Sequence, residues 1–357
     1  MNTPITFSVS DKRATVPVYI GSGTFQEIHS IILLNKYSCV FIIIDENVNK
    51  HWGEKINEVI GKEASSMMIP AGEKNKTLVT VEKIWATLSK KGVDRKSLII
   101  NIGGGMACDI GAFAASTYMR GISFVQVPTT LLAMADAAIG GKTGFNFNGL
   151  KNTIGTFSMP LAVISDSSFL TTLPQREFRS GFAEVIKHAL IEEGNLFDYL
   201  SNANFASLKE KELDNLLSLS TTIKCTIVTK DPFEKGERKK LNFGHTVGHA
   251  VEMACGNQLL HGEAVAIGMI AEARMSFLSG YLPENKFREI ENLIAKAKLP
   301  TKVSAAYKNA IIEKMLSDKK NVKQKIKWVF LEDIGNVNVD VILSEEIIDQ
   351  GLNYILK

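Results

Sequence analysis

Residues 97–111 read SLIINIGGGMACDIG, and the order of their parts decides the class of fold. The run SLIINI has the length and the β-branched content of a buried strand, and three glycines follow it directly. The residues after the glycines read as the first turns of a helix. A buried strand that turns through glycines into a helix is the repeating unit of an α/β domain with a parallel sheet.

Three further apolar runs of the same kind lie outward from this stretch. They are SCVFIIID at 38–45, ISFVQVPTT at 122–130 and LAVISD at 161–166, and residues 77–93 have apolar side chains at helical spacing. Apolar strands separated by helices predict a parallel sheet with both faces covered, and ligands of such sheets bind outside the carboxyl ends of the strands. At those ends this chain carries Asp45, Gly103–Gly105, Pro128–Thr130 and Asp166.

The second half of the chain has a different character. From Pro174 onward long patterns of helical spacing dominate, and one late pair of short strands, 326–333 and 337–343, reads as a hairpin around IGN. No internal repeat or Gly/Ser-rich linker interrupts the chain. We therefore predict an α/β domain over residues 1–172 and a mostly helical domain over residues 173–357.

Composition excludes several classes of protein. The chain has 357 residues and a net charge of +3, which is too small for this length to predict nucleic-acid binding. The four cysteines lie far apart without a C-x-x-C pair, which argues against a disulfide framework and against a cysteine zinc site. The first residues do not read as a signal peptide, and the apolar run Cys39–Ile44 is too short to span a bilayer. We expect a cytoplasmic protein that binds neither nucleic acid nor membrane.

The glycine turn is a candidate phosphate site. Glycines there let backbone amides approach a pyrophosphate at a helix N-terminus, and Asp45 at another strand end is a candidate partner of a ribose. The stretch departs from G-x-G-x-x-G because Cys108 stands where the last glycine would be, and no acid follows about 20 residues later. A tight strand-to-helix turn explains the glycines equally well, so the turn alone leaves both interpretations open.

Residues 241–262, LNFGHTVGHAVEMACGNQLLHG, hold three of the six histidines of the chain. On a helix His245 and His249 share one face, an arrangement common in zinc sites, although the glutamate of H-E-x-x-H is missing. A partly buried histidine with a structural partner is the usual alternative for any one of them. Spacing alone favours His245 and His249 as metal ligands, with His261 as the third.

Charged side chains also occur in two apolar stretches. Glu184 and Lys187 lie in AEVIKHAL, where an i,i+3 salt bridge is the simplest explanation of the pair. Lys142 and Lys151 lie among glycines and asparagines, a setting that suits the binding of phosphate or carboxylate. Solvated surface charge is the alternative for each lysine, and it fits these two less well because their neighbours are small and uncharged.

Seven segments, taken in order, resemble the 3-dehydroquinate synthases, and the resemblance runs from about Asp45 to Lys320. The segments are PAGEK (70–74), GGGMACD (103–109), YMRGISFVQVPTTLLAMADAAIGGKTG (118–144), GLKNTIG (149–155), LPQREFRSGFAEVIKHALI (173–191), LNFGHTVGHAVE (241–252) and HGEAVAIGM (261–269). Members of this family of sugar-phosphate cyclases have an N-terminal α/β domain that binds NAD and a mostly helical C-terminal domain that binds metal and substrate. The resemblance implies these roles for the two predicted domains.

The resemblance also implies the reaction. It is a step of the shikimate pathway, which leads to chorismate and the aromatic amino acids, and it makes the protein a carbon–oxygen lyase. The substrate is 3-deoxy-D-arabino-heptulosonate 7-phosphate, and the products are 3-dehydroquinate and phosphate. NAD takes hydride from one carbinol, phosphate is eliminated, the hydride returns, and the opened ring closes by an intramolecular aldol reaction. The implied cofactors are NAD and a divalent metal, zinc or cobalt, and the implied assembly is a homodimer.

The same resemblance assigns residues to each role. The implied metal ligands are Glu184, His245 and His261, which leave open positions for substrate, as a catalytic zinc requires. The implied substrate contacts are Lys142, Asn152, Lys187, Lys224, Arg238, Asn242 and His249. Further active-site positions are Glu234 and one lysine of the pair Lys319 and Lys320. The implied NAD contacts are Asp45, Glu73, Lys76, Gly104, Gly105, Asp109, Thr129, Thr130, Asp136, Lys142, Lys151 and, as an addition, Thr172.

Three other functions are alternatives at this point. A sister cyclase, such as a 2-epi-5-epi-valiolone synthase or a 2-deoxy-scyllo-inosose synthase, would rearrange the substrate pocket, and the intact GGKTG, GLKN and LNFGHTVGH segments argue against it. A metal-dependent alcohol or glycerol dehydrogenase would carry a lysine soon after Asp109, where this chain has Ile110, Gly111 and Ala112. A binding protein that has lost catalysis would lack metal ligands or pocket lysines, and these are present.

Overall fold

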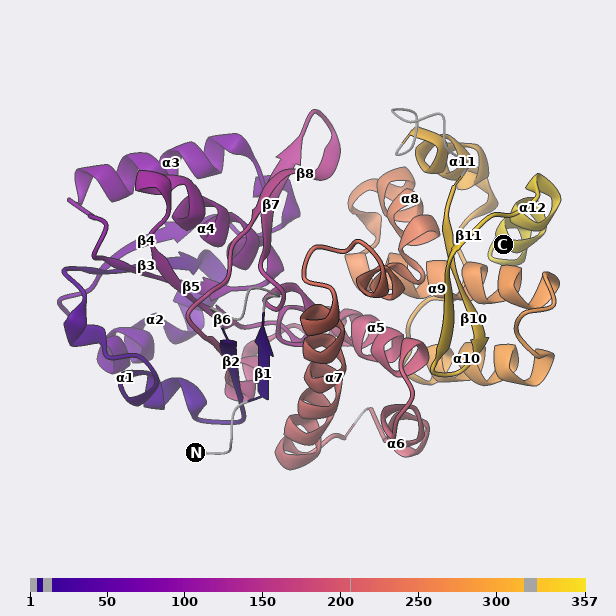
Figure 1. Ribbon diagram of the computed structural model, residues 1–357, viewed down its shortest axis with the longest axis horizontal. Helices are drawn as coiled ribbons and strands as arrows, with labels where there is room; N and C mark the ends of the chain where they lie inside the picture. Colours follow the sequence, from indigo (N-terminus) through magenta and orange to yellow (C-terminus); the bar gives the residue numbers. More distant parts are fainter. Residues whose placement is uncertain (1–4, 9–14, 206, 318–325) are drawn as a thin grey trace. The chain divides into compact units, whose positions relative to one another are not determined.

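The computed structural model describes residues 5–8, 15–205, 207–317 and 326–357 (Figure 1). These residues form two compact units. The first unit extends to Pro174 and includes Glu210–Pro232, and the second comprises Gln175–Lys209 and Phe233–Lys357. Among the residues that the structure describes, no helix is both long enough and apolar enough to cross a lipid bilayer.

A seven-stranded sheet organises the first unit. The strand order is β1-β2-β9-β6-β5-β3-β4, and all neighbouring strands are parallel except β1 and β2. The strands are β1 (Ile5–Ser8), β2 (Thr15–Ile20), β3 (Val40–Asp45), β4 (Ser65–Ile69), β5 (Leu98–Gly103), β6 (Ser123–Pro128) and β9 (Val163–Ser165). The predicted parallel sheet is therefore confirmed, and each of the four predicted strands belongs to it.

Helices cover both faces of this sheet (Figure 1). They include α1 (Ile28–Ile31), α2 (Glu46–Ile60), α3 (Leu78–Lys90) and α4 (Gly105–Thr117). Phe41 and Ile43 of β3 join one apolar cluster with buried side chains of α3 and α4. Because side chains alternate along a strand, Ile42 and Ile44 point to the opposite face, where α2 packs against β3 and β4. The mostly apolar character of the central strands follows from this double coverage.

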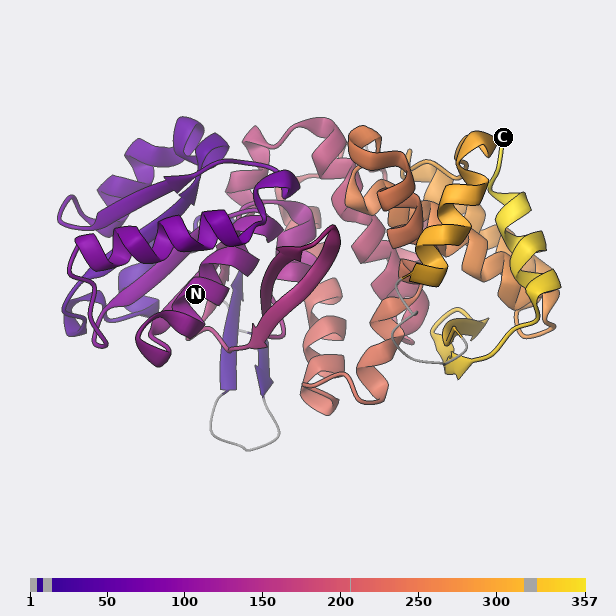
Figure 2. The same cartoon turned by 90° about the horizontal axis from the view of Figure 1, so that it is seen from above.

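A two-stranded ribbon, β7 (Lys142–Phe147) with β8 (Leu150–Phe157), is separate from the main sheet, as Figure 2 also shows. It carries the GGKTG and GLKN segments of the sequence. Thr143 and Thr156 of the two strands are joined through their hydroxyl groups at 2.7 Å. The ribbon therefore holds the segments around Lys142 and Asn152 as one element.

The first unit also contains α7 (Glu210–Lys230), which lies beyond the predicted division at residues 172 and 173. Its buried Cys225 and Val228 join an apolar cluster with Phe7 and Val18 of the sheet. Helical spacing identifies a helix, but it does not say which surface will cover the apolar face of that helix. The first unit's main segment ends at Pro174, two residues after the end of the predicted α/β domain, and the unit also takes in Glu210–Pro232.

The second unit is built around α9 (His261–Leu278), of which 13 of 18 residues are buried. A helix that is apolar on all sides needs neighbours on all sides, and other helices and a hairpin pack against it. The elements that pack against it are α5 (Gln175–Ile191), α8 (His245–Cys255), α10 (Glu284–Lys296), α12 (Glu345–Tyr354) and β10 (Trp328–Asp333). The unit also contains α6 (Leu196–Asn202), α11 (Lys308–Ser317) and β11 (Asn336–Val341), which pack against α5, α8 and β10 respectively. The antiparallel pair of β10 and β11 confirms the predicted hairpin, and the helices confirm the mostly helical character of this half.

Candidate metal and nucleotide sites

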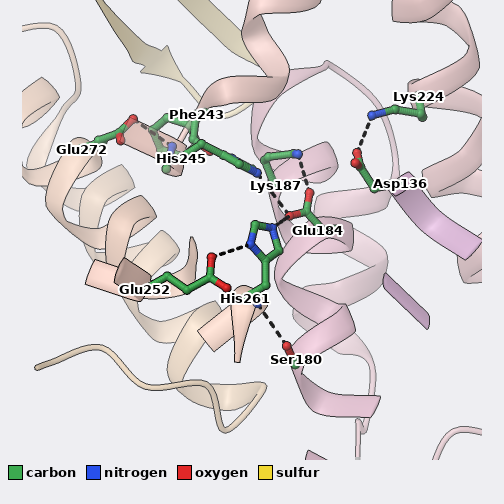
Figure 3. A network of polar contacts seen from close by, with 12 residues as sticks. Asp136, Ser180, Glu184, Lys187, Lys224, Phe243, His245, Glu252, His261 and Glu272 are labelled. Carbon is green, nitrogen blue, oxygen red and sulfur yellow. Dashed lines mark hydrogen bonds and ion pairs between the residues drawn. The ribbon is translucent and has the colours of Figure 1, made fainter. Parts of the chain in front are cut away.

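Three helices of the second unit bring one acid and two histidines together (Figure 3). Glu184 lies in the middle of α5 and is 1% exposed. His245 is the first residue of α8, which begins after Gly244 at a φ of 78°. His261 is the first residue of α9. Both histidines thus stand at helix starts and face a carboxylate in the core.

The distances between these groups suit a shared ion better than direct hydrogen bonds. Glu184 Oε1 lies 3.5 Å from His245 Nε2 and 3.4 Å from His261 Nε2. Hydrogen bonds between nitrogen and oxygen are usually about 2.7–3.2 Å long. Two donor atoms that bind one tetrahedral zinc at about 2.05 Å are about 3.4 Å apart. The carboxylate oxygen of Glu184 therefore lies from each imidazole nitrogen at the distance expected for two ligands of one ion.

The other ring nitrogen of each histidine has its own partner. His261 Nδ1 lies 3.1 Å from Glu252 Oε2, and His245 Nδ1 lies 3.2 Å from Phe243 O. A carboxylate and a carbonyl can only accept, so Nδ1 is the donor in both contacts. When the rings are neutral, each presents the lone pair of Nε2 toward Glu184. Histidines that bind metals commonly have this arrangement.

His249 lies one helical turn beyond His245, as its spacing predicted. The ligand atoms of His245, His249 and His261 all lie within 4.8 Å of one another, so these three can also hold an ion. The ring centroid of His249 is 5.2 Å from that of His245 and 5.8 Å from that of His261. The geometry is compatible both with the three histidines and with Glu184 in place of His249.

Burial and neighbouring charges shift the pKa values of both histidines. At His261 burial opposes protonation, but the adjacent carboxylates of Glu184 and Glu252 outweigh it and raise the pKa to about 9. Burial lowers the pKa of His245, and the ammonium of Lys187 lowers it further. A bound cation requires both rings to be neutral, so it would displace the proton that His261 otherwise holds between two acids.

Lys187 contacts Glu184 directly, and both side chains are almost completely buried. This is the i,i+3 salt bridge that the sequence suggested as the simplest explanation of the pair. A buried ion pair of this kind is costly to break from one side, because the remaining charge has lost its solvent. Lys187 is therefore the ion-pair partner of the candidate ligand Glu184.

Two acids that support the histidines were missed by sequence reasoning. Glu252 contacts His261, as described above, and the fully buried Glu272 accepts from Gly244 N at 2.8 Å and from Val247 N at 3.1 Å. Glu272 thereby satisfies the free amides at the start of α8, where His245 lies. The available signal was an acid in an otherwise apolar helical stretch, since a buried carboxylate needs donors.

Other predicted substrate contacts of the second unit lie just before α8. Arg238 is 1% exposed and belongs to the short helical segment η7 (Glu237–Asn242). Asn242 Nδ2 donates to Glu234 Oε1 at 2.6 Å. The structure therefore joins two residues that the resemblance placed in the active site separately. Lys319 and Lys320 lie outside the described residues.

The first unit joins several predicted NAD and substrate contacts in one network. Lys76 contacts Asp109, and Lys76 Nζ donates to Asn152 Oδ1 at 2.5 Å. Asn146, which sequence reasoning missed, donates from Nδ2 to Glu73 Oε1 and accepts from Asn152 N, both at 2.9 Å. Burial raises the pKa of Asp109, and Lys76 opposes this shift. The ribbon is thus tied to the segment that carries Glu73 and Lys76.

The ends of three parallel strands meet at the glycine turn. Thr129 N donates to Gly103 O at 2.9 Å, and a Cβ atom at Gly104 would lie 3.1 Å from Thr130 Cγ2. Asp45 Oδ1 accepts from Asn47 N at 2.8 Å and so caps α2, which gives Asp45 a structural role of its own. Tight packing thus explains Gly104, while α4 begins there without a side-chain cap and leaves backbone amides for an anion.

The remaining predicted contacts of the first unit have varied surroundings. Lys224 of α7 donates to Asp136 Oδ1 at 2.6 Å (Figure 3). Thr172 Oγ1 accepts from Trp52 Nε1 at 2.7 Å. A Cβ atom at Gly105 would lie 3.2 Å from Ala137 Cβ. Lys142 is exposed at the start of β7, and Lys151 is partly buried in β8.

Curated relatives match nearly the whole chain, and two family models match most of it. The model of the 3-dehydroquinate synthase N-terminal domain matches residues 66–180, and that of the C-terminal domain matches residues 181–321. The 3-dehydroquinate synthase of Thermoanaerobacter pseudethanolicus is 39% identical over 94% of this chain and 97% of its own length. That of Gloeobacter violaceus is 42% identical over 90% of each chain.

Solved structures of sister cyclases have the same fold. A 2-deoxy-scyllo-inosose synthase complexed with carbaglucose-6-phosphate, NAD+ and Co2+ has a TM-score of 0.89 at 25% identity, over 99% of this chain and 100% of that one. A 2-epi-5-epi-valiolone synthase from Streptomyces hygroscopicus, with NAD+ and Zn2+ bound, has a TM-score of 0.87 at 27% identity, over 98% of each chain. A probable glycerol dehydrogenase from Sinorhizobium meliloti, at 15% identity and a TM-score of 0.66 over 95% and 96%, shares the fold alone.

Proposed function

Since this chain belongs to the 3-dehydroquinate synthase family, we propose that Glu184, His245 and His261 bind the divalent metal of its reaction. The chain is an enzyme of the shikimate pathway that forms 3-dehydroquinate from the heptulosonate phosphate. The observation that carries the metal assignment is the approach of both Nε2 atoms to Glu184 Oε1, at 3.5 and 3.4 Å. Their Nδ1 partners further support it, since they leave Nε2 available in each ring.

We propose that NAD binds to the first unit at the carboxyl ends of the parallel strands. The uncapped start of α4 supports a pyrophosphate there, and the sister cyclases with bound NAD+ have the same fold. The proposed contacts are Asp45, Glu73, Lys76, Gly104, Gly105, Asp109, Thr129, Thr130, Asp136, Lys142, Lys151 and Thr172. NAD when bound supplies a reversible hydride acceptor, and the metal supplies a Lewis acid for substrate hydroxyl groups.

We propose that buried cations of the chain orient the substrate, which carries a carboxylate and a phosphate. Lys187, Lys224 and Arg238 are at most 5% exposed, and an ammonium or guanidinium kept out of water makes strong contacts to carboxylate and phosphate. Lys187 and Lys224 form ion pairs with Glu184 and Asp136. We propose that these cations bind the anionic groups of the substrate, together with Lys142, Asn152 and Asn242.

We propose that His249 faces substrate and does not bind metal. An imidazole that is not a ligand can hold or move a proton at a substrate hydroxyl near neutral pH. His249 lies one turn from His245 on α8, so it stands next to the proposed ligands. Glu234, whose carboxylate accepts from Asn242, orients that amide toward the same substrate.

One assay tests the function as a whole. The purified enzyme is supplied with the heptulosonate phosphate, catalytic NAD and zinc, and phosphate and 3-dehydroquinate are measured over time. Equal amounts of both products, with NAD regenerated, are expected. Phosphate release without the carbocycle would contradict the function, and stoichiometric accumulation of NADH would favour the dehydrogenase. Turnover of a hexose phosphate or heptulose phosphate, which lack the carboxylate of the heptulosonate, would favour a sister cyclase.

Three further properties are proposals of the same kind. The four cysteines are free thiols, which suits a reducing compartment, so we propose that the enzyme works in the cytoplasm. We propose a homodimer, which sedimentation of the purified protein tests. Either zinc or cobalt suits one carboxylate and two imidazoles, so metal analysis of protein purified without added metal identifies the native ion.

A further inference from the structure

We propose that Glu252 is a positioning residue of the metal site, whose carboxylate fixes His261 in the tautomer and orientation that present Nε2 to the metal. The proposal rests on the metal ligands proposed above and adds a residue outside that set. Glu252 belongs to α8, whereas His261 begins α9. The contact therefore joins two helices that are consecutive in the chain and that each carry one histidine of the site.

The geometry of the contact determines the tautomer. Glu252 Oε2 lies 3.1 Å from His261 Nδ1, on the side of the ring opposite to Glu184 (Figure 3). An ionised carboxylate accepts but cannot donate, so the hydrogen of the neutral ring must lie on Nδ1. The ring lone pair is then on Nε2, the atom that lies 3.4 Å from Glu184 Oε1. Without Glu252 the ring could rotate or carry its hydrogen on Nε2, and either change removes the ligand atom.

Burial makes this contact specific. Glu252 is 8% exposed, and a carboxylate in that position needs partners that replace water. His261 supplies one such partner, and His245 receives the equivalent support from the carbonyl of Phe243. Of these two supports, Glu252 is the one that a side-chain substitution can remove. The two histidines are therefore oriented by different groups, a carboxylate for His261 and a backbone carbonyl for His245, and only the carboxylate carries a charge.

The charge of Glu252 also suits a divalent ion. The carboxylate of Glu184 already contacts the ammonium of Lys187, so part of its charge is compensated without a metal. A second carboxylate, one imidazole ring away, raises the basicity of His261 and helps to neutralise the cation. Removal of such outer carboxylates from metal sites typically weakens metal binding about 10–100-fold.

The test compares the zinc affinity of metal-free protein and three variants, measured by competition with a chromophoric chelator. Glu252→Ala is expected to bind zinc about 10–100-fold more weakly than the unchanged protein. Glu252→Gln keeps an acceptor oxygen without the charge, so its loss is expected to be smaller than that of Glu252→Ala. Visible absorption of the cobalt-loaded proteins reports the ligand field, and a changed spectrum is expected for Glu252→Ala.

Glu263→Gln is the matched control. Glu263 lies at the same helix start, where it accepts from Leu260 N at 2.8 Å and binds Arg176, so its loss lowers stability through the fold. It is expected to melt earlier than the unchanged protein and to bind zinc equally well. Zinc binding by Glu252→Ala at the unchanged affinity would overturn the proposal. So would an equal loss of affinity in Glu263→Gln and Glu252→Ala.

A second measurement needs no variant and stays decisive if Glu252→Ala does not fold. Selective ¹⁵N labelling of the six histidines allows the protonated nitrogen of each ring to be read by NMR in the zinc-loaded protein. We expect His261 to carry hydrogen on Nδ1, and hydrogen on Nε2 would overturn the proposal. Failure of the metal assignment itself is distinguishable, because His261→Ala would then retain its metal.

Discussion

Replacing Gly262 with alanine is expected to move α5 away from α9, and with it Glu184 away from His261. A Cβ atom at residue 262 would lie 1.9 Å from the carbonyl oxygen of Ser180 and 2.7 Å from its hydroxyl oxygen. The carbonyl oxygen belongs to the backbone and cannot rotate away. The two helices must therefore separate by about 1.5 Å to reach the 3.4 Å of ordinary contact. The hydrogen bond from Gly262 N to Ser180 Oγ, 3.1 Å long, is lost in that movement.

The size of the effect follows from this separation. Overpacking against neighbouring atoms costs about 1–3 kcal/mol, and a clash with backbone lies at the upper end, about 3 kcal/mol. For a unit of this size that loss lowers the melting temperature by about 6–12 °C. The ligand atoms of Glu184 and His261 are 3.4 Å apart, so a shift of about 1.5 Å along that line takes them well outside zinc geometry. We expect zinc affinity to fall about tenfold or more.

The assay combines calorimetry of the metal-free protein with zinc titration. Gly53→Ala in α2 is the control, because its Cβ would meet the end of the Asn49 side chain, at 2.7 Å, and that side chain can rotate. Alanine in a helix interior is favoured over glycine by about 0.5–1 kcal/mol, so the control is expected to melt no earlier and to bind zinc normally. If Gly262→Ala melts and binds zinc as the control does, the contact between α5 and α9 does not position the site.

Three other predictions test separate parts of the structure. Lys187→Met removes the ammonium that pairs with the buried carboxylate of Glu184. Calorimetry should therefore show a loss of about 3–5 kcal/mol in the free energy of unfolding of the metal-free protein and a smaller loss with zinc bound; equal losses would refute this reasoning. Asn146→Ala breaks the hydrogen-bonded link between Glu73 and Asn152, so NAD affinity should fall and the KM for the heptulosonate phosphate should rise. Unchanged values of both would show that this link does not position the two binding sites. The ammonium of Lys239 lowers the pKa of Asp340, so the pair stabilises the fold above the unfolded value of about 3.9, and this stability is lost as the pH falls through the lowered pKa. Asp340→Asn should therefore lower the melting temperature at pH 7 and progressively less below pH 4, and a difference that does not depend on pH would contradict the ion pair.

The parallel sheet could be predicted because its strands carry the signal themselves. Each of β3, β5, β6 and β9 is a short apolar run, and such runs occur in strands with helices on both faces. The place of α7 could not be predicted in this way. Its apolar residues could be buried equally well against a sheet or against helices, and only the folded structure places Cys225 and Phe7 in one apolar cluster.

The candidate metal site was partly accessible from the sequence. The i,i+4 spacing of His245 and His249 follows from helix geometry and is present in α8. Spacing could not bring in Glu184, because that residue is distant in the chain and reaches the histidines through the packing of α5. The supporting acids Glu252 and Glu272 were missed for the same reason, since hydrogen bonds between helices leave no periodic trace in a sequence.

The metal content of three purified variants, His245→Ala, His261→Ala and His249→Ala, tests the central claim most directly. Each variant is loaded with zinc, dialysed and analysed for bound metal, and its activity is measured in parallel. The proposed ligands predict that His245→Ala and His261→Ala lose the metal, while His249→Ala keeps it and loses activity. A metal-free His249→Ala protein, or a metal-loaded His261→Ala protein, would contradict the proposed ligand set.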